Sequence, residues 1–584
     1  MTFEIHKTAS GQLMEARVTR MPFNKWKPIE IMLAVLFLVA PFVYFPNIGG
    51  TGLRIPNNIT VWLVVNCIAW YSLYLIAKRQ QLAKPKYFSF IIAFPVLATV
   101  SGFISDVANP VEWFFRLLFI WMGLLFFLGL FQHKLSQGRI DRILFVIVIS
   151  ALLQCLVGII QITVPHAMTP VWFPSIANIT VQPFGVFQQI NNQSSYQVTA
   201  LVIAIYLISR PYIHQGPFWK KMVLFIFFAL SAYIISLSGS RIGLLSALLA
   251  IPLVLFARWS YLKKQKNLSL IALLYLIGGI SFGASGFGTV LDKTEQISEG
   301  YTASYRVGIY AVSLDLIKQK PLFGHGIGSF KKVWQFEKAV FYEKHPDANL
   351  IEQYVTHPHN EFLFWAVEGG VAAVIGMLLV ITGILLSLKG QNRYRWGVFV
   401  AFLLPIILHT QVELPFYTSA VHWFLTLFLL FVLMRINTNI NTLKLSSSAL
   451  ASIRIFSAAL LMFGTTFLIH SMKANYELSN IKNNLWNASA AKVNPYFSHL
   501  LDSVQMKTIF LYNHREGKKQ DIPVYIEWAE NYLSREPSET MFIYLALAYQ
   551  DMGNEEQMCR IMQQGAGIYP QNADLKNGLN YCDN

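Results

Sequence analysis

Long runs of apolar residues dominate the chain and restrict what it can fold into. A helix needs about 20 such residues to cross ~30 Å of hydrocarbon, where every backbone amide must find its partner within the protein. Hydrophobic residues make up 54% of the 584 residues, and charged residues only 13%. That balance excludes an ordinary soluble protein, so the sequence predicts an all-α, polytopic membrane protein.

The apolar runs predict about thirteen membrane helices, an odd number that places the two ends of the chain on opposite sides. The expected segments are Ile29 to Phe45, Ile59 to Ala77, Tyr87 to Ile104, Val111 to Phe131, Ile143 to Val164, Ser194 to Ser209, Met222 to Leu237, Ile242 to Ala257, Leu268 to Phe287, Glu361 to Leu388, Trp396 to Leu408, Ser419 to Met434 and Ile453 to Met472.

Lysine and arginine cluster in every second loop, for example at Lys78 and Arg79, and at Arg393 and Arg395. Basic loops are retained in the cytoplasm, so residues 1–28 are expected to form a cytoplasmic arm. No cleavable signal peptide is expected, because the first apolar run follows this polar arm. The net charge of +16 is mostly a topology signal that also favours anionic lipid headgroups, and nucleic acid is not an expected partner.

Three parts follow from this topology: the arm, a membrane domain at 29–472 with a large outer loop at 288–360, and an exported helical domain at 473–584. Pro537 and Pro570 lie 33 residues apart in the last part, close to the ~34-residue period of tetratricopeptide units. The exported domain is either a helical cap or a platform that holds a protein partner.

The four cysteines divide between compartments. Cys67 and Cys155 fall inside apolar helices, where thiols act as small inert side chains. Cys559 and Cys582 fall in the exported domain, where an oxidising environment permits a disulfide between them.

The segment from Thr356 to Glu361 contains two imidazoles, an amide and a carboxylate where the large loop re-enters the membrane. Histidine exchanges protons readily near neutral pH, so this position favours chemistry on a lipid-borne substrate. His357 and His359 are two residues apart on a proline-containing turn, which differs from the i, i+4 helical spacing that binds zinc well. No metal is therefore expected.

Other polar groups gather on the same outer side. The amide-rich segment from Gln182 to Gln193 either binds sugar and phosphate oxygens or caps a helix. Arg241 and Arg306 carry the planar fork that suits a pyrophosphate, although an isolated arginine more often snorkels or pairs with a carboxylate.

Two further groups are expected to be structural. Glu112 and Arg116 have the i, i+4 spacing of an ion pair. Glu368 lies within a membrane segment and needs a buried polar partner, while Gly369 and Gly370 are expected to serve helix packing.

Taken together and in this order, these motifs resemble the O-antigen ligase and polymerase superfamily, over residues 182–417. The motifs are Gln189 to Gln193, Ser240-Arg241-Ile242-Gly243, Tyr305-Arg306, Pro321 to Phe330, His359-Asn360-Glu361 and Glu368-Gly369. The exported domain and the turn from Glu413 to Tyr417 look more like the bacterial O-oligosaccharyltransferases that glycosylate pilins.

The resemblance implies a GT-C-type glycosyltransferase of the Gram-negative inner membrane that acts on the periplasmic face without cofactor or metal. Such enzymes move an oligosaccharide as one block from undecaprenyl pyrophosphate to serine or threonine of an exported protein. Position by position, it implies catalytic roles for His359, Arg241, Arg306, Gln189 and Tyr417. Supporting roles are expected for His357, Asn360, Glu361 and Asn191.

One departure affects the amide segment. It reads Gln189-Ile190-Asn191 here, whereas many superfamily members have proline and histidine after the first glutamine and asparagine. The partner of Gln189 therefore stays undetermined by the resemblance.

Three alternatives stay open. A lipopolysaccharide O-antigen ligase shares the core but usually stops soon after the last helix, and an O-antigen polymerase joins two lipid-linked repeats. A transporter would also need many helices, but it should carry internal repeats and polar residues at mid-membrane.

Overall fold

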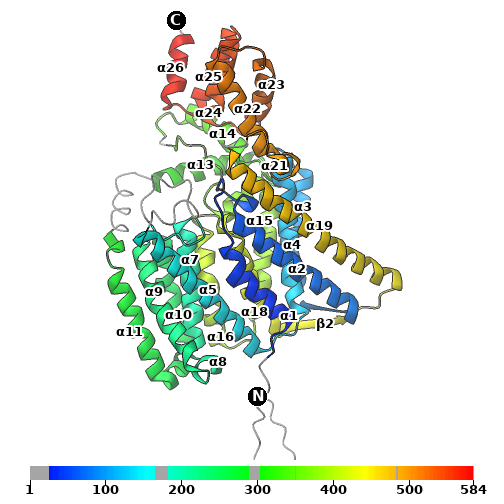
Figure 1. Cartoon of the computed structure of the whole chain (residues 1–584), viewed down its shortest axis with the longest axis vertical. Helices are drawn as coiled ribbons and strands as arrows, with labels where there is room; N and C mark the ends of the chain where they lie inside the picture. Colours follow the sequence, from blue (N-terminus) through cyan, green and yellow to red (C-terminus); the bar gives the residue numbers. More distant parts are fainter. Residues whose placement is uncertain (1–24, 165–181, 289–302, 349, 482–484, 583–584) are drawn as a thin grey trace, which may run out of the picture.

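The computed structural model describes residues 25–164, 182–288, 303–348, 350–481 and 485–582, and it is almost entirely helical (Figure 1). Most of the expected cytoplasmic arm, and parts of two outer segments at 165–181 and 289–302, lie outside these residues. Within the described ranges, the only strands are β1 (Gln81–Pro85) and β2 (Thr438–Thr442), which form one antiparallel pair with Gln81 opposite Thr442.

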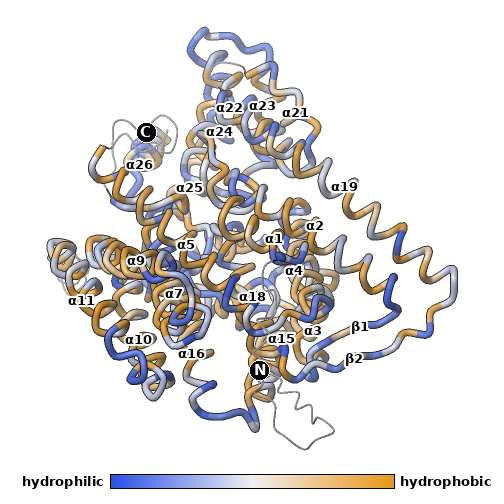
Figure 2. The backbone as a smooth tube through the Cα atoms, turned by 60° about the horizontal axis from the view of Figure 1, so that its bottom comes forward, coloured by the Kyte–Doolittle hydropathy of each residue, from blue (hydrophilic) through white to orange (hydrophobic). Residues whose placement is uncertain are grey.

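Eight helical stretches in the described residues are long and apolar enough to cross a membrane. They are α2 (Pro56–Arg79), α4 (Pro110–Phe131), α5 (Gln137–Thr163), α9 (Phe218–Leu237), the 42-residue stretch Arg241–Phe282, α15 (Glu361–Leu388), the stretch Ala420–Asn437 and α19 (Ser447–Ser479). In Figure 2 these elements are mostly apolar along their lengths, and polar residues gather near their ends and on β1 and β2.

Each expected membrane segment overlaps a helix, but the helices do not all meet the length and hydropathy of a crossing. The stretch Arg241–Phe282 contains α10 (Arg241–Leu262), η4 (Lys263–Gln265) and α11 (Lys266–Phe282), and so covers two of the expected segments. The remaining apolar helices are shorter or more polar, so the number of crossings stays a prediction. They are α1 (Pro28–Ala34) with η1 (Val35–Val39) and η2 (Ala40–Phe42), α3 (Phe88–Ile104), α7 (Ile190–Ile208) and α16 (Arg393–His409).

Several short elements connect these helices. They are η3 (Gly52–Arg54), α8 (Pro211–His214) and α17 (Pro415–Thr418). The stretch Ala420–Asn437 consists of α18 (Ala420–Met434) and η5 (Arg435–Asn437). α1 starts at one end of the helix bundle, and the last helix of the chain ends at the other (Figure 1).

The large loop before α15 contributes α13 (Ala303–Gln319) and α14 (Phe330–Lys344), which pack on the start of α15 around Trp334 and Phe364. Between them, the backbone from Pro321 to Gly326 inserts beside a kink in α15. The Val371 and Ala372 amides donate to the Pro321 and Leu322 carbonyls, at 2.8 and 3.1 Å.

Gly370 forms this kink, with φ 63° and ψ −165°. A Cβ at this position would lie 2.5 Å from the carbonyl group of Leu322. Gly370 was expected only to help helices pack, but its positive φ and its missing side chain also let another backbone segment approach.

The C-terminal helices, which the sequence predicts to be exported, continue from α19. They are α21 (Ser489–Val493), α22 (Ser498–Arg515), α23 (Ile522–Leu533), α24 (Glu539–Asp551), α25 (Glu555–Ile568) and α26 (Ala573–Cys582). Consecutive helices from α21 onward pack against each other, and the core of α22 to α26 extends to Phe336 and Ala339 of α14. The structure places a disulfide between Cys559 and Cys582, and it keeps Cys67 and Cys155 as free thiols. The similarity to tetratricopeptide units stays a prediction.

Substituting Gly370 with alanine should destabilise the packing of the Pro321–Gly326 segment on α15. The positive φ alone costs a non-glycine residue about 1–3 kcal/mol, and the clash with Leu322 adds to that cost. The melting temperature of the detergent-purified G370A variant should therefore fall well below that of the wild type. Gly278 has nothing within 4 Å of its added Cβ, so G278A is the matched control and should melt like the wild type. Equal melting temperatures for G370A and G278A would show that the kink is not required.

Candidate active site

The histidine turn immediately precedes α15, whose start fixes its position. Asn360 is the N-cap residue, and its side chain accepts a hydrogen bond from the Leu363 amide at 3.0 Å. His359 adopts a positive φ of 55°. This conformation reverses the chain so that the amide of His359 donates to Nδ1 of His357 at 3.2 Å, and the two rings pack edge to face.

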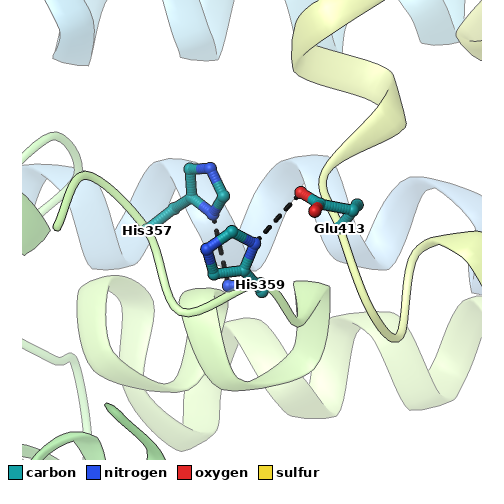
Figure 3. A group of neighbouring side chains, drawn as sticks. All are labelled: His357, His359 and Glu413. Carbon is teal, nitrogen blue, oxygen red and sulfur yellow. Dashed lines mark hydrogen bonds and ion pairs between the residues drawn. The ribbon is translucent and has the colours of Figure 1, made fainter. Parts of the chain in front are cut away.

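Glu413 holds His359 from a separate segment, the turn between α16 and α17 (Figure 3). Its Oε2 lies 3.0 Å from Nδ1 of His359. A carboxylate can only accept, so Nδ1 carries a proton, and in the neutral form of the ring Nε2 keeps its lone pair. No described residue forms a hydrogen bond with Nε2. A base oriented by a carboxylate in this way is prepared to take a proton from a substrate.

The pKa values of His357 and Glu413 are both lowered, but by different causes. Burial, followed by the charge of His359, lowers the pKa of His357 to about 4, so His357 is neutral at physiological pH. Burial tends to raise the pKa of Glu413, but the hydrogen bond and charge of His359 outweigh it and lower that pKa. Glu413 therefore stays ionised and continues to accept from His359.

The two outer arginines lie close to this cluster. Nη2 of Arg306, on α13, is 3.9 Å from Oε1 of Glu413. Arg241, at the start of α10, is exposed and near enough to Arg306 for their charges to repel. Two guanidinium groups held together with one carboxylate leave an excess of positive charge, which suits an anionic group such as a pyrophosphate.

The amide-rich segment meets the start of α10. Ser240 caps α10 and also donates to Oδ1 of Asn191 at 2.8 Å, which places Asn191 beside Arg241. Gln189 precedes α7 without a side-chain capping bond, and its Oε1 is buried without a partner in the described residues. The helix-cap explanation therefore does not account for Gln189.

Tyr417 and Glu361 form a separate pair. The Tyr417 hydroxyl donates to Oε1 of Glu361 at 3.3 Å, and the same oxygen accepts from the indole of Trp365 at 3.0 Å. The ring of Tyr417 lies 5.4 Å from the guanidinium of Arg116. Tyr417 thus contacts the support beneath the turn, and no described contact joins it to His359.

A buried charge network lies behind this pair. Arg116 pairs with Glu112 at 3.2 Å, as its spacing predicted, and it also pairs with Glu368. Glu368 was expected to need a buried polar partner, and the structure provides two. They are the guanidinium of Arg116 and the amide of Phe330, whose nitrogen lies 3.0 Å from Oε1 of Glu368. Glu112 further pairs with Lys331, whose Nζ lies 3.5 Å from Oε1 of Glu536, between α23 and α24 of the C-terminal helices.

A second network, not indicated by the sequence, supports the amide-rich segment. Ser195 on α7 bonds Nδ1 of His409 at 2.9 Å and Nε2 of His422 at 3.2 Å, and all three side chains are buried. The Nε2 of His422 also lies 3.1 Å from the Asn192 carbonyl. These contacts fix the start of α7 against α16 and α18, and no local motif marks them because the partners are more than 200 residues apart.

His357, His359 and Glu413 each offer one ligand atom, and these atoms lie within 4.8 Å of one another. A cation bound through the two Nδ1 atoms would displace the hydrogen bonds that both of them make. It would also meet the positive charge of Arg306 beside Glu413. This donor set suits a metal poorly and suits an oriented base well.

Comparison with known proteins agrees with the motifs. A family model described as O-antigen ligase matches residues 226–381, which include Arg241, Arg306 and His359. A second model, described as the C-terminal part of a virulence factor membrane-bound polymerase, matches residues 398–579. The resemblance to the O-antigen ligase superfamily is confirmed.

A curated relative within this superfamily has a more specific name. A general O-oligosaccharyltransferase of Acinetobacter baylyi (strain ATCC 33305 / BD413 / ADP1) is 25% identical over 361 residues. The match covers 58% of this chain and 57% of the relative.

The low pKa of His357 predicts how the stability of this O-antigen ligase relative depends on pH. The unfolded chain takes up a proton near pH 6.5 and the folded chain only near pH 4, so stability is complete above that window and falls as the pH drops through it. Replacing His357 with asparagine should remove that loss, which reaches on the order of 3 kcal/mol by pH 4. Melting temperatures measured between pH 7 and pH 4 test this, with the exposed His345→Asn as control. Superimposable curves for H357N and the wild type would contradict the assignment.

Proposed function

We propose that this chain transfers an oligosaccharide as one block from undecaprenyl pyrophosphate to serine or threonine side chains of exported proteins, such as a pilin. The observation that carries the proposal is the His359–Glu413 pair beside Arg306 and Arg241. It combines an oriented base with the positive charge that a departing pyrophosphate needs.

The reaction we infer is a single displacement at the anomeric carbon. Nε2 of His359 removes the proton of the acceptor hydroxyl while its oxygen bonds to the anomeric carbon. The bond from that carbon to the pyrophosphate oxygen breaks, and undecaprenyl pyrophosphate leaves with the bonding electrons. General-base assistance contributes about 10²–10⁴ in rate, which suffices with so good a leaving group.

The remaining residues would position the substrates. Arg241 and Arg306 stabilise the negative charge that grows on the pyrophosphate. The unpartnered buried oxygen of Gln189, with Asn191 nearby, would accept hydrogen bonds from sugar hydroxyls. His357 orients His359 through the backbone, and Tyr417 with Glu361 supports the turn.

We further propose that the enzyme lies in the inner membrane with its N-terminus in the cytoplasm and its active site in the periplasm. The basic loops support that orientation. The exported helices pack on α14, which belongs to the same outer region as the site, and so they are suitably placed to hold an acceptor protein there.

A polymerase that joins lipid-linked repeats is the second candidate. The observation that favours it is the polymerase-related model over residues 398–579. A polymerase would differ from a protein glycosyltransferase in its product, because a polymerase lengthens a lipid-linked glycan and leaves exported proteins unmodified.

Replacing His359 with asparagine should abolish protein glycosylation, by a factor of about 10² or more, because the base is lost. His357→Asn is the matched control, since asparagine keeps a neutral acceptor near the His359 amide, and it should retain most activity. The intact masses of periplasmic proteins, measured from cells carrying each variant, report the transfer. Unchanged protein masses alongside altered surface polysaccharide would reject protein transfer and favour the polymerase.

A further inference from the structure

Four arginines converge at the opposite end of the membrane helices from the active site. They come from separate elements: Arg210 follows α7, Arg258 lies near the end of α10, Arg395 lies in the first turn of α16, and Arg435 starts η5 after α18. The helices that carry them pack together, because α10 contacts both α7 and α16, and α16 also contacts α18. All four guanidinium groups act electrostatically on Tyr206, which lies at the centre of this group, the inner arginine cluster.

Asp141 is the one carboxylate paired with the inner arginine cluster in the described part of the chain. Its Oδ2 accepts from Nε of Arg210 at 2.9 Å, and its Oδ1 accepts from Gln137 at 2.8 Å. Within the described ranges, Arg258 donates only to the Ser209 hydroxyl, and Arg435 donates only to neutral oxygens. The cluster therefore carries four positive charges against one negative charge.

Several guanidinium groups of the cluster also lack hydrogen-bond acceptors among the described residues, which again indicates a site for an anion. The side chain of Arg395 forms no hydrogen bond or ion pair with a described residue, although it stacks on Phe399 at 5.6 Å. Nη2 of Arg258 and Nε of Arg435 are buried without an acceptor among the residues that the structure describes. The positive charges of Arg395 and Arg210 also repel the charge of Arg435. Buried donors without acceptors are costly, so a site of this kind requires an anion with several oxygens.

The surroundings of the cluster indicate a lipid as the source of that anion. Phe256, Trp259 and Tyr261 flank Arg258 on α10, and each is more than half exposed, at 64%, 54% and 52%. Exposed aromatic side chains at a helix end are typical of the membrane interface. Basic pockets between membrane helices on the cytoplasmic side are where anionic headgroups bind.

We propose that the inner arginine cluster binds the phosphate of an anionic phospholipid, with the acyl chains against the exposed aromatic residues of α10. The site is remote from the inferred chemistry and does not depend on the proposed function. Its bound lipid would neutralise the repulsion between the arginines and so stabilise the packing of α7, α10, α16 and α18.

Native mass spectrometry of the full-length protein in detergent, titrated with dioleoyl phosphatidylglycerol, tests the proposal. Losing one basic contact should weaken binding about fivefold, so Arg395→Gln and Arg258→Gln should both show this loss. Arg393→Gln is the matched control, because Arg393 is exposed and bonds only Tyr394 among the described residues. Zwitterionic dioleoyl phosphatidylcholine should bind the wild type and all variants equally weakly.

Melting temperatures supply a second readout that does not rely on lipid surviving ionisation. Phosphatidylglycerol should raise the melting temperature of the wild type and of R393Q, and should raise that of R395Q by less than half as much. Equal shifts in R393Q and R395Q, or no preference over phosphatidylcholine, would overturn the proposal. The same stabilisation by inorganic phosphate alone would also overturn it, in favour of a free anion.

Discussion

The buried ion pair between Arg116 and Glu368 is the contact on which the outer half of the molecule depends. Glu368 is only 1% exposed within α15, and a carboxylate in that position is tolerated only when it is paired and hydrogen-bonded. Its partners come from α4 and from the start of α14, and Arg116 also lies over Phe364 and Tyr417. Removing one partner of such a pair costs about 3–5 kcal/mol, so one contact fixes four elements.

The geometry of the candidate site follows from this arrangement. With α15 fixed, the turn immediately before it positions His359, and Glu413 reaches His359 from the turn that leads to Tyr417. The positive φ of His359 is a conformation that non-glycine residues seldom adopt, and it is held by the caps and pairs on both sides. The two histidines thus differ in role because one bonds a carboxylate and the other bonds a backbone amide.

Local patterns predicted much of this. Apolar runs identified the membrane helices, and the sequence from Thr356 to Glu361 identified the turn that carries His359. The i, i+4 spacing identified the Glu112–Arg116 pair, and the compartment argument anticipated the partners Cys559 and Cys582. Each of these signals lies within one helix, one turn or one small domain.

Contacts between distant segments were not predictable in the same way. Glu413 is 54 residues from His359, and Arg116 is 252 residues from Glu368, so no spacing rule links either pair. The inner arginines appeared only as a topology signal, because their convergence requires four helices to pack. Gly370 looked like a packing residue, since its positive φ becomes evident only with the segment at Pro321 in place.

The central claim is that His359, oriented by Glu413, activates a protein hydroxyl towards a lipid-linked oligosaccharide. The most direct measurement uses the purified full-length protein in nanodiscs with undecaprenyl-pyrophosphate-linked oligosaccharide and a serine-containing acceptor peptide. Mass spectrometry should show the peptide gaining the whole oligosaccharide in one step, equally with and without a chelator, and Glu413→Gln should slow this step. An unmodified peptide beside a lengthened lipid-linked glycan, or a rate unaffected by Glu413→Gln, would contradict the account.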